Sequence, residues 1–406
     1  MAVGEYPFPF MHPVAGVKVT AVSAGIKKVN RRDVVLFELV EGSSVAGVFT
    51  RNAFCAAPVT LCRKHLAAAP IRYLLINSGN ANACTGEQGL RDALATCEAI
   101  ATRTGVQPEQ VLPFSTGVIG EPLPVDKIIN VIPEALTQLT EGGWEQAGQG
   151  IMTTDTRPKG FSQQIEHDGK IITVNGIAKG AGMIRPNMAT MLGYVATDAK
   201  IAQPLLQQLA REAADLSFNR ITIDGDTSTN DSCILIATGQ VDLPEVSAAE
   251  GELYEKLRTV IFAAHTHLAK SIVSDGEGAT KFVTVAVSGG ATRDECLDVA
   301  YAVAHSPLIK TALFASDPNW GRIVAAIGYA GISDLDATKV RVHLNDVLIV
   351  ENGGRAASYT EAQGQAVMNG SEITIGIHLN RGTFAETIWT TDLSYDYVRI
   401  NADYRS

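Results

Sequence analysis

The stretch GIAKGAGMIRPNMATML, residues 176–192, is the part of the chain where the signals of regular secondary structure fail. It is dense in glycine and other small residues, and one proline interrupts it. Functional residues concentrate in loops that depart from local sequence rules, because a rigid scaffold can hold them there. We therefore expect this stretch to carry chemistry, with regular elements on both sides of it.

The flanking sequence alternates between strand-like and helix-like segments. Runs rich in β-branched and large apolar residues predict strands at residues 33–40, 71–77, 281–287 and 372–379. Apolar residues at helical spacing predict helices at residues 87–104 and 205–216. Without a repeat of fixed period, this mixture predicts a mixed α/β (α+β) protein in which helices cover layered sheets. The length of 406 residues suggests two or three domains.

Local signals mark the ends of several of these elements. Thr85 and Gln88 have the spacing of a capping box for the helix at 87–104, and Gly105 suits its C-terminal end. Two short β-type runs around an Asn-Asp pair predict the strands of a hairpin at residues 340–344 and 347–350.

The charge balance restricts the class of partner. A net charge of -10 argues against nucleic acid or an anionic membrane surface as the main partner, but it allows a local basic pocket for a small carboxylate. The first residues lack the basic region and apolar core of a secretory signal, and no apolar stretch is long enough to span a bilayer. Six scattered cysteines fit neither a disulfide framework nor a zinc site. We expect a cytoplasmic protein with reduced thiols.

Several common catalytic motifs fail on spacing. The glycines at 180 and 182 follow Lys179 but do not form a phosphate-binding loop, and no G-x-S-x-G elbow is present. His265 and His267 point to different faces of a predicted helix and have no other ligand nearby in the sequence, so we expect no metal. Residues 77–82, NSGNAN, predict a polar turn with side-chain caps. We assign capping and turn roles to the carboxylates Asp224, Asp226 and Asp231.

Ala189 and Thr190 remain within the glycine-rich stretch. By composition alone, such a threonine is structural, for example a helix cap. Nine sequence blocks change this interpretation: AGVFTRNAFCAAPV (46–59), NSGNANACTG (77–86), STGVIG (115–120), GIMTTDTRPK (150–159), AKGAGMIRPNMATML (178–192), DGDTSTND (224–231), SDGEGATK (274–281), SDPNWGR (316–322) and INADYRS (400–406). In this order, from end to end, the chain resembles the ornithine acetyltransferase (glutamate N-acetyltransferase) family of arginine biosynthesis.

The resemblance implies self-cleavage between Ala189 and Thr190, which would give an alpha chain of residues 1–189 and a beta chain of residues 190–406. The chemistry is sound, because the Thr190 hydroxyl can attack the preceding carbonyl through a five-membered ring. The cut then frees an α-amino group that can act as general base for the same hydroxyl. The implied fold is a layered arrangement of sheets and helices in which the fragments stay associated, commonly as two alpha and two beta chains.

The resemblance also implies the roles of individual residues. Thr190 would carry the acetyl group from N-acetylornithine to glutamate, and the Thr116 hydroxyl and Gly117 N–H would form the oxyanion hole. The implied substrate-binding positions are Thr153, Lys179, Thr190, Glu277, Asn401 and Ser406. From charge, we infer that Lys179 pairs with a substrate carboxylate and Glu277 with an ammonium group.

Two alternative functions remain open. An N-terminal-threonine amidohydrolase or aminopeptidase would share the nucleophile but transfer the acyl group to water. A non-catalytic amino-acid-binding protein would need no cleavage. The sequence also leaves open whether acetyl-CoA serves as a co-substrate, which would add N-acetylglutamate synthase activity; no other cofactor is expected.

Overall fold

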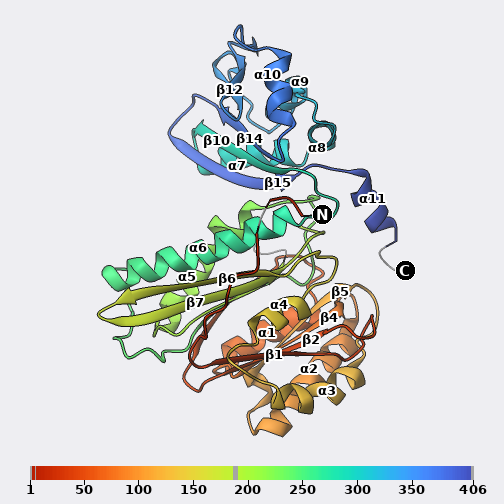
Figure 1. The fold of residues 1–406 in the computed structure, drawn as a ribbon, viewed down its shortest axis with the longest axis vertical. Coiled ribbons are helices and arrows are strands. Elements are labelled where there is room, and N and C mark those ends of the chain that lie inside the picture. The colour runs from red at the N-terminus through yellow and green to blue at the C-terminus, as the bar shows by residue number, and fades with distance from the viewer. Residues whose placement is uncertain (1, 5, 186–190, 404–406) are drawn as a thin grey trace. The chain divides into compact units, whose positions relative to one another are not determined.

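The computed structural model describes residues 2–4, 6–185 and 191–403. It divides into two compact units, each built from separate stretches of the chain. The larger unit holds residues Tyr6–Asn219 and Thr227–Ile272, and the smaller holds Met1–Glu5, Arg220–Asp226 and Val273–Ser406. The predicted mixed α/β class is confirmed, since both units combine helices with sheets (Figure 1).

The larger unit contains two sheets. The first has the order β1-β2-β4-β5, with β4 and β5 parallel and the other pairs antiparallel. Its strands are β1 (Val17–Val22), β2 (Val34–Leu39), β4 (Tyr73–Asn80) and β5 (Val111–Val118). The second has the order β3-β9-β8-β7-β6, with only β8 and β9 parallel. Its strands are β3 (Ser44–Phe49), β6 (Lys159–His167), β7 (Lys170–Lys179), β8 (Leu192–Thr197) and β9 (Ser232–Ala237).

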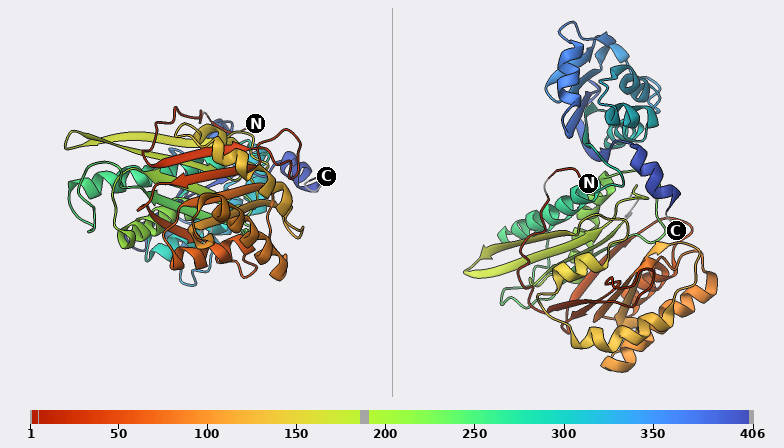
Figure 2. Two further views of the ribbon diagram at one scale, coloured as in Figure 1. Left: turned by 90° about the horizontal axis from the view of Figure 1, so that it is seen from below. Right: turned by 45° about the vertical axis from the view of Figure 1, so that its right-hand side comes forward.

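The side chains of β2 alternate between a core shared with the second sheet and a layer of helices on the other face. In β2, Val35 and Phe37 join a core with Ile177 and Tyr194 of the second sheet. The intervening β2 residues pack instead on the outer layer that includes α2 and α3. The layers are visible in Figures 1 and 2. The helices of this unit are α1 (Ala57–Ala68), α2 (Gly86–Thr104), α3 (Val125–Thr137), α4 (Trp144–Gly150), α5 (Gln203–Leu216) and most of α6 (Glu252–Ser274).

The smaller unit is built on one sheet of the order β13-β12-β11-β14-β10-β15, in which only β10 and β14 run parallel. The strands are β10 (Phe282–Gly290), β11 (Arg341–Leu344), β12 (Val347–Glu351), β13 (Gly354–Arg355), β14 (Glu372–His378) and β15 (Phe384–Thr391). The helices are α7 (Arg293–Ala304), α8 (Pro307–Phe314), α9 (Trp320–Gly328), α10 (Glu361–Met368) and α11 (Tyr395–Ala402). Val283, Val299 and Ile375 belong to its apolar core.

Most local predictions are confirmed, and one cap is wrong. The helix that contains residues 87–104 ends at Gly105, which has φ +79°, as expected for a left-handed C-terminal residue. Thr85 makes no side-chain cap; its hydroxyl is turned toward Asn82 and donates to Oδ1 at 2.8 Å. The stretch at 176–192 is also more regular than predicted, since β7 continues through Lys179 and β8 begins at Leu192. Among the described residues, no helix has the length and apolar character needed to cross a membrane.

Candidate active site

Gly117 lies beside Gly79 in the parallel pair β4–β5, where the register shifts. Its φ is +139°, a conformation that side chains rarely allow. A Cβ at this position would lie 2.3 Å from the carbonyl carbon of Gly79 and 2.5 Å from the nitrogen of Asn80. Both are backbone atoms, so they cannot rotate away. The close approach of the two strands therefore requires glycine at 117, one of the two predicted oxyanion-hole residues.

Thr116, the other predicted oxyanion-hole residue, is buried in β5. Its Oγ1 lies 3.3 Å from Nζ of Lys179, which is the last residue of β7 and is also buried. Lys179 pairs in turn with Leu192 across the ladder between β7 and β8. The structure thus brings together two predicted site residues from different sheets, close to the point where β8 begins.

Asp155 is a buried carboxylate that sequence reasoning missed. It accepts hydrogen bonds from Lys159 Nζ at 2.6 Å, from the Gly180 N–H at 2.7 Å and from the Thr153 N–H at 2.9 Å. Burial alone would raise the pKa of this carboxyl, but Lys159 and Lys179 hold its pKa well below the usual range. Asp155 therefore supplies a fixed negative charge to the two lysines and binds the backbone of a predicted substrate-binding residue.

Asparagine side chains connect β5, which carries Thr116 and Gly117, to its neighbours. The amide of Asn230 donates to the carbonyl of Ala81 at 2.5 Å and to that of Ser115, the residue before Thr116, at 2.9 Å. Ser115 in turn donates to Oδ1 of Asn77 at 2.6 Å. These buried bonds give the asparagines of two sequence blocks scaffold roles. The polar turn predicted for residues 77–82 is wrong, because residues 77–80 continue strand β4. The role of Asn230 was missed because its partners are more than a hundred residues away.

Asp231 corrects one sequence-based assignment. We expected a turn or capping residue, but its side chain is buried and its Oδ2 has no hydrogen-bond partner among the described residues. Burial raises the pKa of this carboxyl well above its usual value, although Ser228, Lys179 and Thr50 oppose the shift. The next residue, Ser232, donates its N–H to the carbonyl of Met191 at 2.9 Å. A buried carboxyl with a raised pKa therefore lies beside the start of β8.

The smaller unit contains a second group of predicted residues. Nδ2 of Asn401 donates to Oε2 of Glu277 at 2.8 Å, so two predicted substrate-binding residues are in direct contact. Nearby, Tyr397 donates to Oδ2 of Asp224 at 3.2 Å, and the N–H of Asp226 donates to Oδ1 of the same carboxylate at 3.2 Å. The latter bond confirms the predicted turn role of Asp224. Burial and the Asp224 charge raise the pKa of Tyr397, so its hydroxyl remains protonated.

Three predicted residues, Ala189, Thr190 and Ser406, lie outside the described residues. Within the described part, no cluster of three or more His, Cys, Asp or Glu side chains could hold a metal ion. His265 is buried with Nδ1 2.7 Å from the carbonyl of Ile261, and burial lowers its pKa to about 4, so its ring is neutral.

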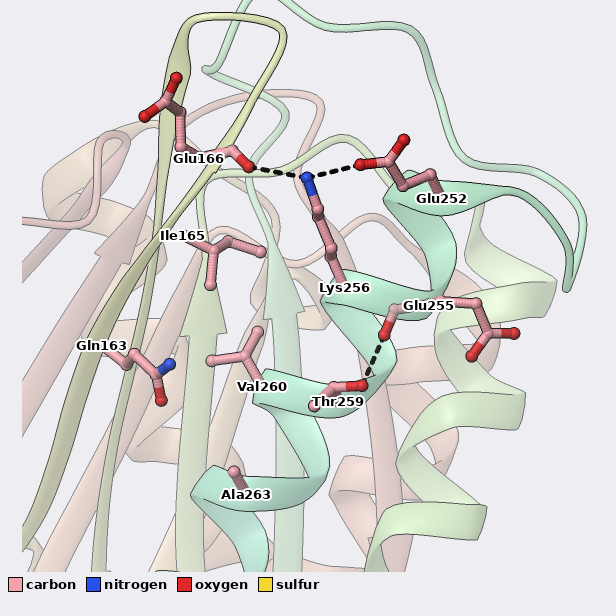
Figure 3. Close-up of a pocket in the computed structure, with 9 residues that line it drawn as sticks. All are labelled: Gln163, Ile165, Glu166, Glu252, Glu255, Lys256, Thr259, Val260 and Ala263. Atoms are coloured by element: carbon pink, nitrogen blue, oxygen red, sulfur yellow. Dashed lines mark hydrogen bonds and ion pairs between the residues drawn. The ribbon is translucent and has the colours of Figure 1, made fainter.

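A pocket of about 540 Å³ lies between β6 and α6 and is lined by none of the described candidate residues (Figure 3). Ile165 and Val260 give it an apolar floor. At its rim, Lys256 Nζ contacts the carbonyl of Glu166 at 3.1 Å and Oε1 of Glu252 at 2.7 Å. Thr116, Lys179 and Asp155 do not line this pocket, and we assign it no part in catalysis.

The comparisons with known proteins show an acyltransferase and identify its family. The model of the ArgJ family matches residues 18–406, so the chain belongs to the ArgJ family. Two curated relatives, each named arginine biosynthesis bifunctional protein ArgJ, come from Pseudomonas fluorescens and Pseudomonas syringae pv. tomato. Each is 63% identical over 406 residues, which is all of both chains. A crystal structure of the protein of that name from Bacillus halodurans is 35% identical and covers 52% of this chain and 97% of its own, with a TM-score of 0.49.

Proposed function

We propose that this protein is a self-cleaving acetyltransferase of arginine biosynthesis that moves the acetyl group of N-acetylornithine to glutamate through an acetyl-Thr190 intermediate. Membership of the ArgJ family supports the reaction. The observation that carries the assignment to this site is the cluster around Thr116. Lys179 contacts the Thr116 hydroxyl and pairs with Leu192, only two residues along the chain from Thr190.

The first step is cleavage of the Ala189–Thr190 bond. The Thr190 hydroxyl attacks the carbonyl of Ala189, the peptide nitrogen leaves, and water hydrolyses the resulting ester. During the attack, negative charge develops on the carbonyl oxygen. Preorganised donors, the Thr116 hydroxyl and the Gly117 N–H, stabilise this charge, and removing one such donor typically costs about 2.7–4 kcal/mol of barrier.

Cleavage creates the catalyst for acetyl transfer. The new α-amino group has a reference pKa of about 7.7–8.0, so near neutral pH it can accept the proton of the Thr190 hydroxyl. Attack on N-acetylornithine forms acetyl-Thr190 and releases ornithine. Glutamate then takes the acetyl group and restores the hydroxyl. The acyl-enzyme stores the acetyl group between the two substrates, so no cofactor is needed.

The proposed substrate contacts are those of Thr153, Thr190, Glu277, Asn401 and Ser406. Lys179, the sixth predicted position, contacts the Thr116 hydroxyl. Glu277 supplies a carboxylate suited to an ammonium group, and Asn401 orients it through their 2.8 Å hydrogen bond. We further propose a cytoplasmic assembly of two alpha and two beta fragments.

Mass spectrometry tests the cleavage. An active preparation should contain fragments of residues 1–189 and 190–406, and Thr190→Ala should remain intact and inactive. Thr197→Ala is the matched control, because it removes the same groups at the other end of β8 and should still cleave. An active but uncut wild-type chain would refute self-processing.

Product analysis separates the transferase from the alternative, a threonine amidohydrolase. Ornithine release from N-acetylornithine should depend on glutamate and should match N-acetylglutamate formation one to one. Ornithine and free acetate without any acceleration by glutamate would support the hydrolase. Thiol release from acetyl-CoA in the presence of glutamate decides whether the protein also acts as an N-acetylglutamate synthase.

A further inference from the structure

The contact between Lys179 and Thr116 determines that the Thr116 hydroxyl hydrogen points away from Lys179. An ammonium group has three N–H donors and no acceptor, so in this 3.3 Å contact the Thr116 oxygen must accept. The single hydrogen of the Thr116 hydroxyl then has to point elsewhere. Among the described residues, no acceptor takes it. The hydroxyl is thus left with one donor available for a new acceptor.

Asp155 accounts for a lysine at this buried position. A buried ammonium is costly unless a negative charge compensates it. Asp155 accepts the N–H of Gly180, the residue after Lys179, and the charge of Lys179 is one of the causes that keep the Asp155 carboxyl ionised. Lys159 lies on the same carboxylate at 2.6 Å. The buried carboxylate thereby offsets the charge of Lys179 and anchors the backbone that carries it.

We propose that Lys179 is a positioning residue of the oxyanion hole, which orients and polarises the Thr116 hydroxyl, and that Asp155 holds Lys179 in this role. The proposal rests on the proposed function and refines it, because the sequence alone suggested that Lys179 pairs with a substrate carboxylate. A donor that itself accepts from a cation is polarised and becomes a stronger donor. Lys179 therefore acts on the transition state through Thr116, whereas a carboxylate contact would act on substrate binding.

A double-mutant cycle of Lys179→Met and Thr116→Val distinguishes these roles. Removing one oxyanion donor lowers kcat by about 10²–10³-fold, so we expect that loss for Thr116→Val and roughly a 10- to 100-fold loss for Lys179→Met. Adding Lys179→Met to Thr116→Val should lower kcat by less than about two-fold further, because the hydroxyl through which the lysine acts is gone. The KM values for both substrates should stay within about three-fold in Lys179→Met.

The double-mutant cycle can also be measured on the rate of self-cleavage, because the oxyanion that forms on the Ala189 carbonyl would use the same two donors. For any variant that cleaves too slowly to give enough mature enzyme for kcat, the rate of appearance of the 1–189 fragment replaces kcat. Lys281→Met is the matched control, since Lys281 is also buried but donates to the carbonyls of Met368 and Gly370 at 2.9 and 2.8 Å. It should lower the unfolding temperature without lowering kcat.

Two results would overturn the proposal while leaving the proposed function intact. One is a loss of kcat in the double variant equal to the product of the two single losses, as expected for an independent or purely structural role. The other is a raised KM with unchanged kcat in Lys179→Met, which would assign the lysine to a substrate carboxylate. A wild-type protein that transfers no acetyl group would instead refute the proposed function itself.

Discussion

Gly117→Ala should be far more damaging than the replacement of one hydrogen by a methyl group suggests. The added Cβ would lie 2.3 Å from the Gly79 carbonyl carbon, whereas carbon atoms in favourable contact are about 3.5–4.0 Å apart. Relieving the clash requires β4 and β5 to separate locally by about 1 Å, enough to break hydrogen bonds of roughly 0.5–1.5 kcal/mol each. The unfavourable φ of +139° adds about 1–3 kcal/mol.

Gly120→Ala separates these two costs. Gly120 also has a positive φ, +85°, but a Cβ there would have no atom within 4 Å. This control therefore measures the backbone strain alone. We expect Gly117→Ala to be less stable than Gly120→Ala by about 2–3 kcal/mol, which corresponds to a difference in unfolding temperature of roughly 5–10 °C.

Thermal unfolding followed by circular dichroism measures the stability difference, and fragment analysis on the same samples measures cleavage. Gly117→Ala should cleave at least about 10²-fold more slowly than Gly120→Ala, because a displaced strand misplaces the N–H donor. Equal unfolding temperatures for the two variants would show that the close approach of β4 and β5 costs nothing, and the argument for glycine at 117 would fail.

Three further predictions concern buried polar groups. Burial lowers the pKa of Lys310 to about 8, so the unfolded state binds more protons than the folded state between about pH 8 and 10.5. In urea unfolding, the free energy of unfolding of wild type should therefore rise by about 3 kcal/mol relative to that of Lys310→Met across this pH range. A difference that stays constant with pH would contradict the prediction. The raised pKa of Asp231 has the opposite sign, so the stability of Asp231→Asn relative to wild type should rise from pH 4 to 8, and a flat difference would refute the burial argument. Asn230→Leu should lose about 1–3 kcal/mol for each carbonyl left without its donor and should lower kcat; unchanged activity would exclude a role in holding Ser115.

Sequence patterns predicted the elements well where the signal was local. The buried face of α5, including Leu205 and Leu209, follows from helical spacing, and the end of α2 follows from Gly105. The Thr85 cap failed because a competing partner, the side chain of Asn82, was available within the same turn. Local rules count possible bonds but do not decide which neighbour a side chain turns toward.

The site was predictable only in part, for a related reason. The family resemblance supplied Thr116, Gly117 and Lys179 as separate positions, and the structure joins Thr116 to Lys179. Asp155 and Asn230 belong to recognised blocks, yet their roles depend on partners that pairing of distant strands brings close. No spacing rule contains that information, because it arises only when both sheets have formed.

The strand order of the second sheet determines how the protein could refold after cleavage. In the order β3-β9-β8-β7-β6, the strands β8 and β9 follow residue 190, while their outer partners β3 and β7 precede it. A cut at the proposed bond would leave one hydrogen-bonded sheet shared by two molecules. Folding before the cut is a first-order process within one chain, but reassembly after unfolding would require two chains to meet. Refolding of the cleaved protein would thus be a bimolecular process. The fraction of activity recovered after heating should then fall as the protein is diluted.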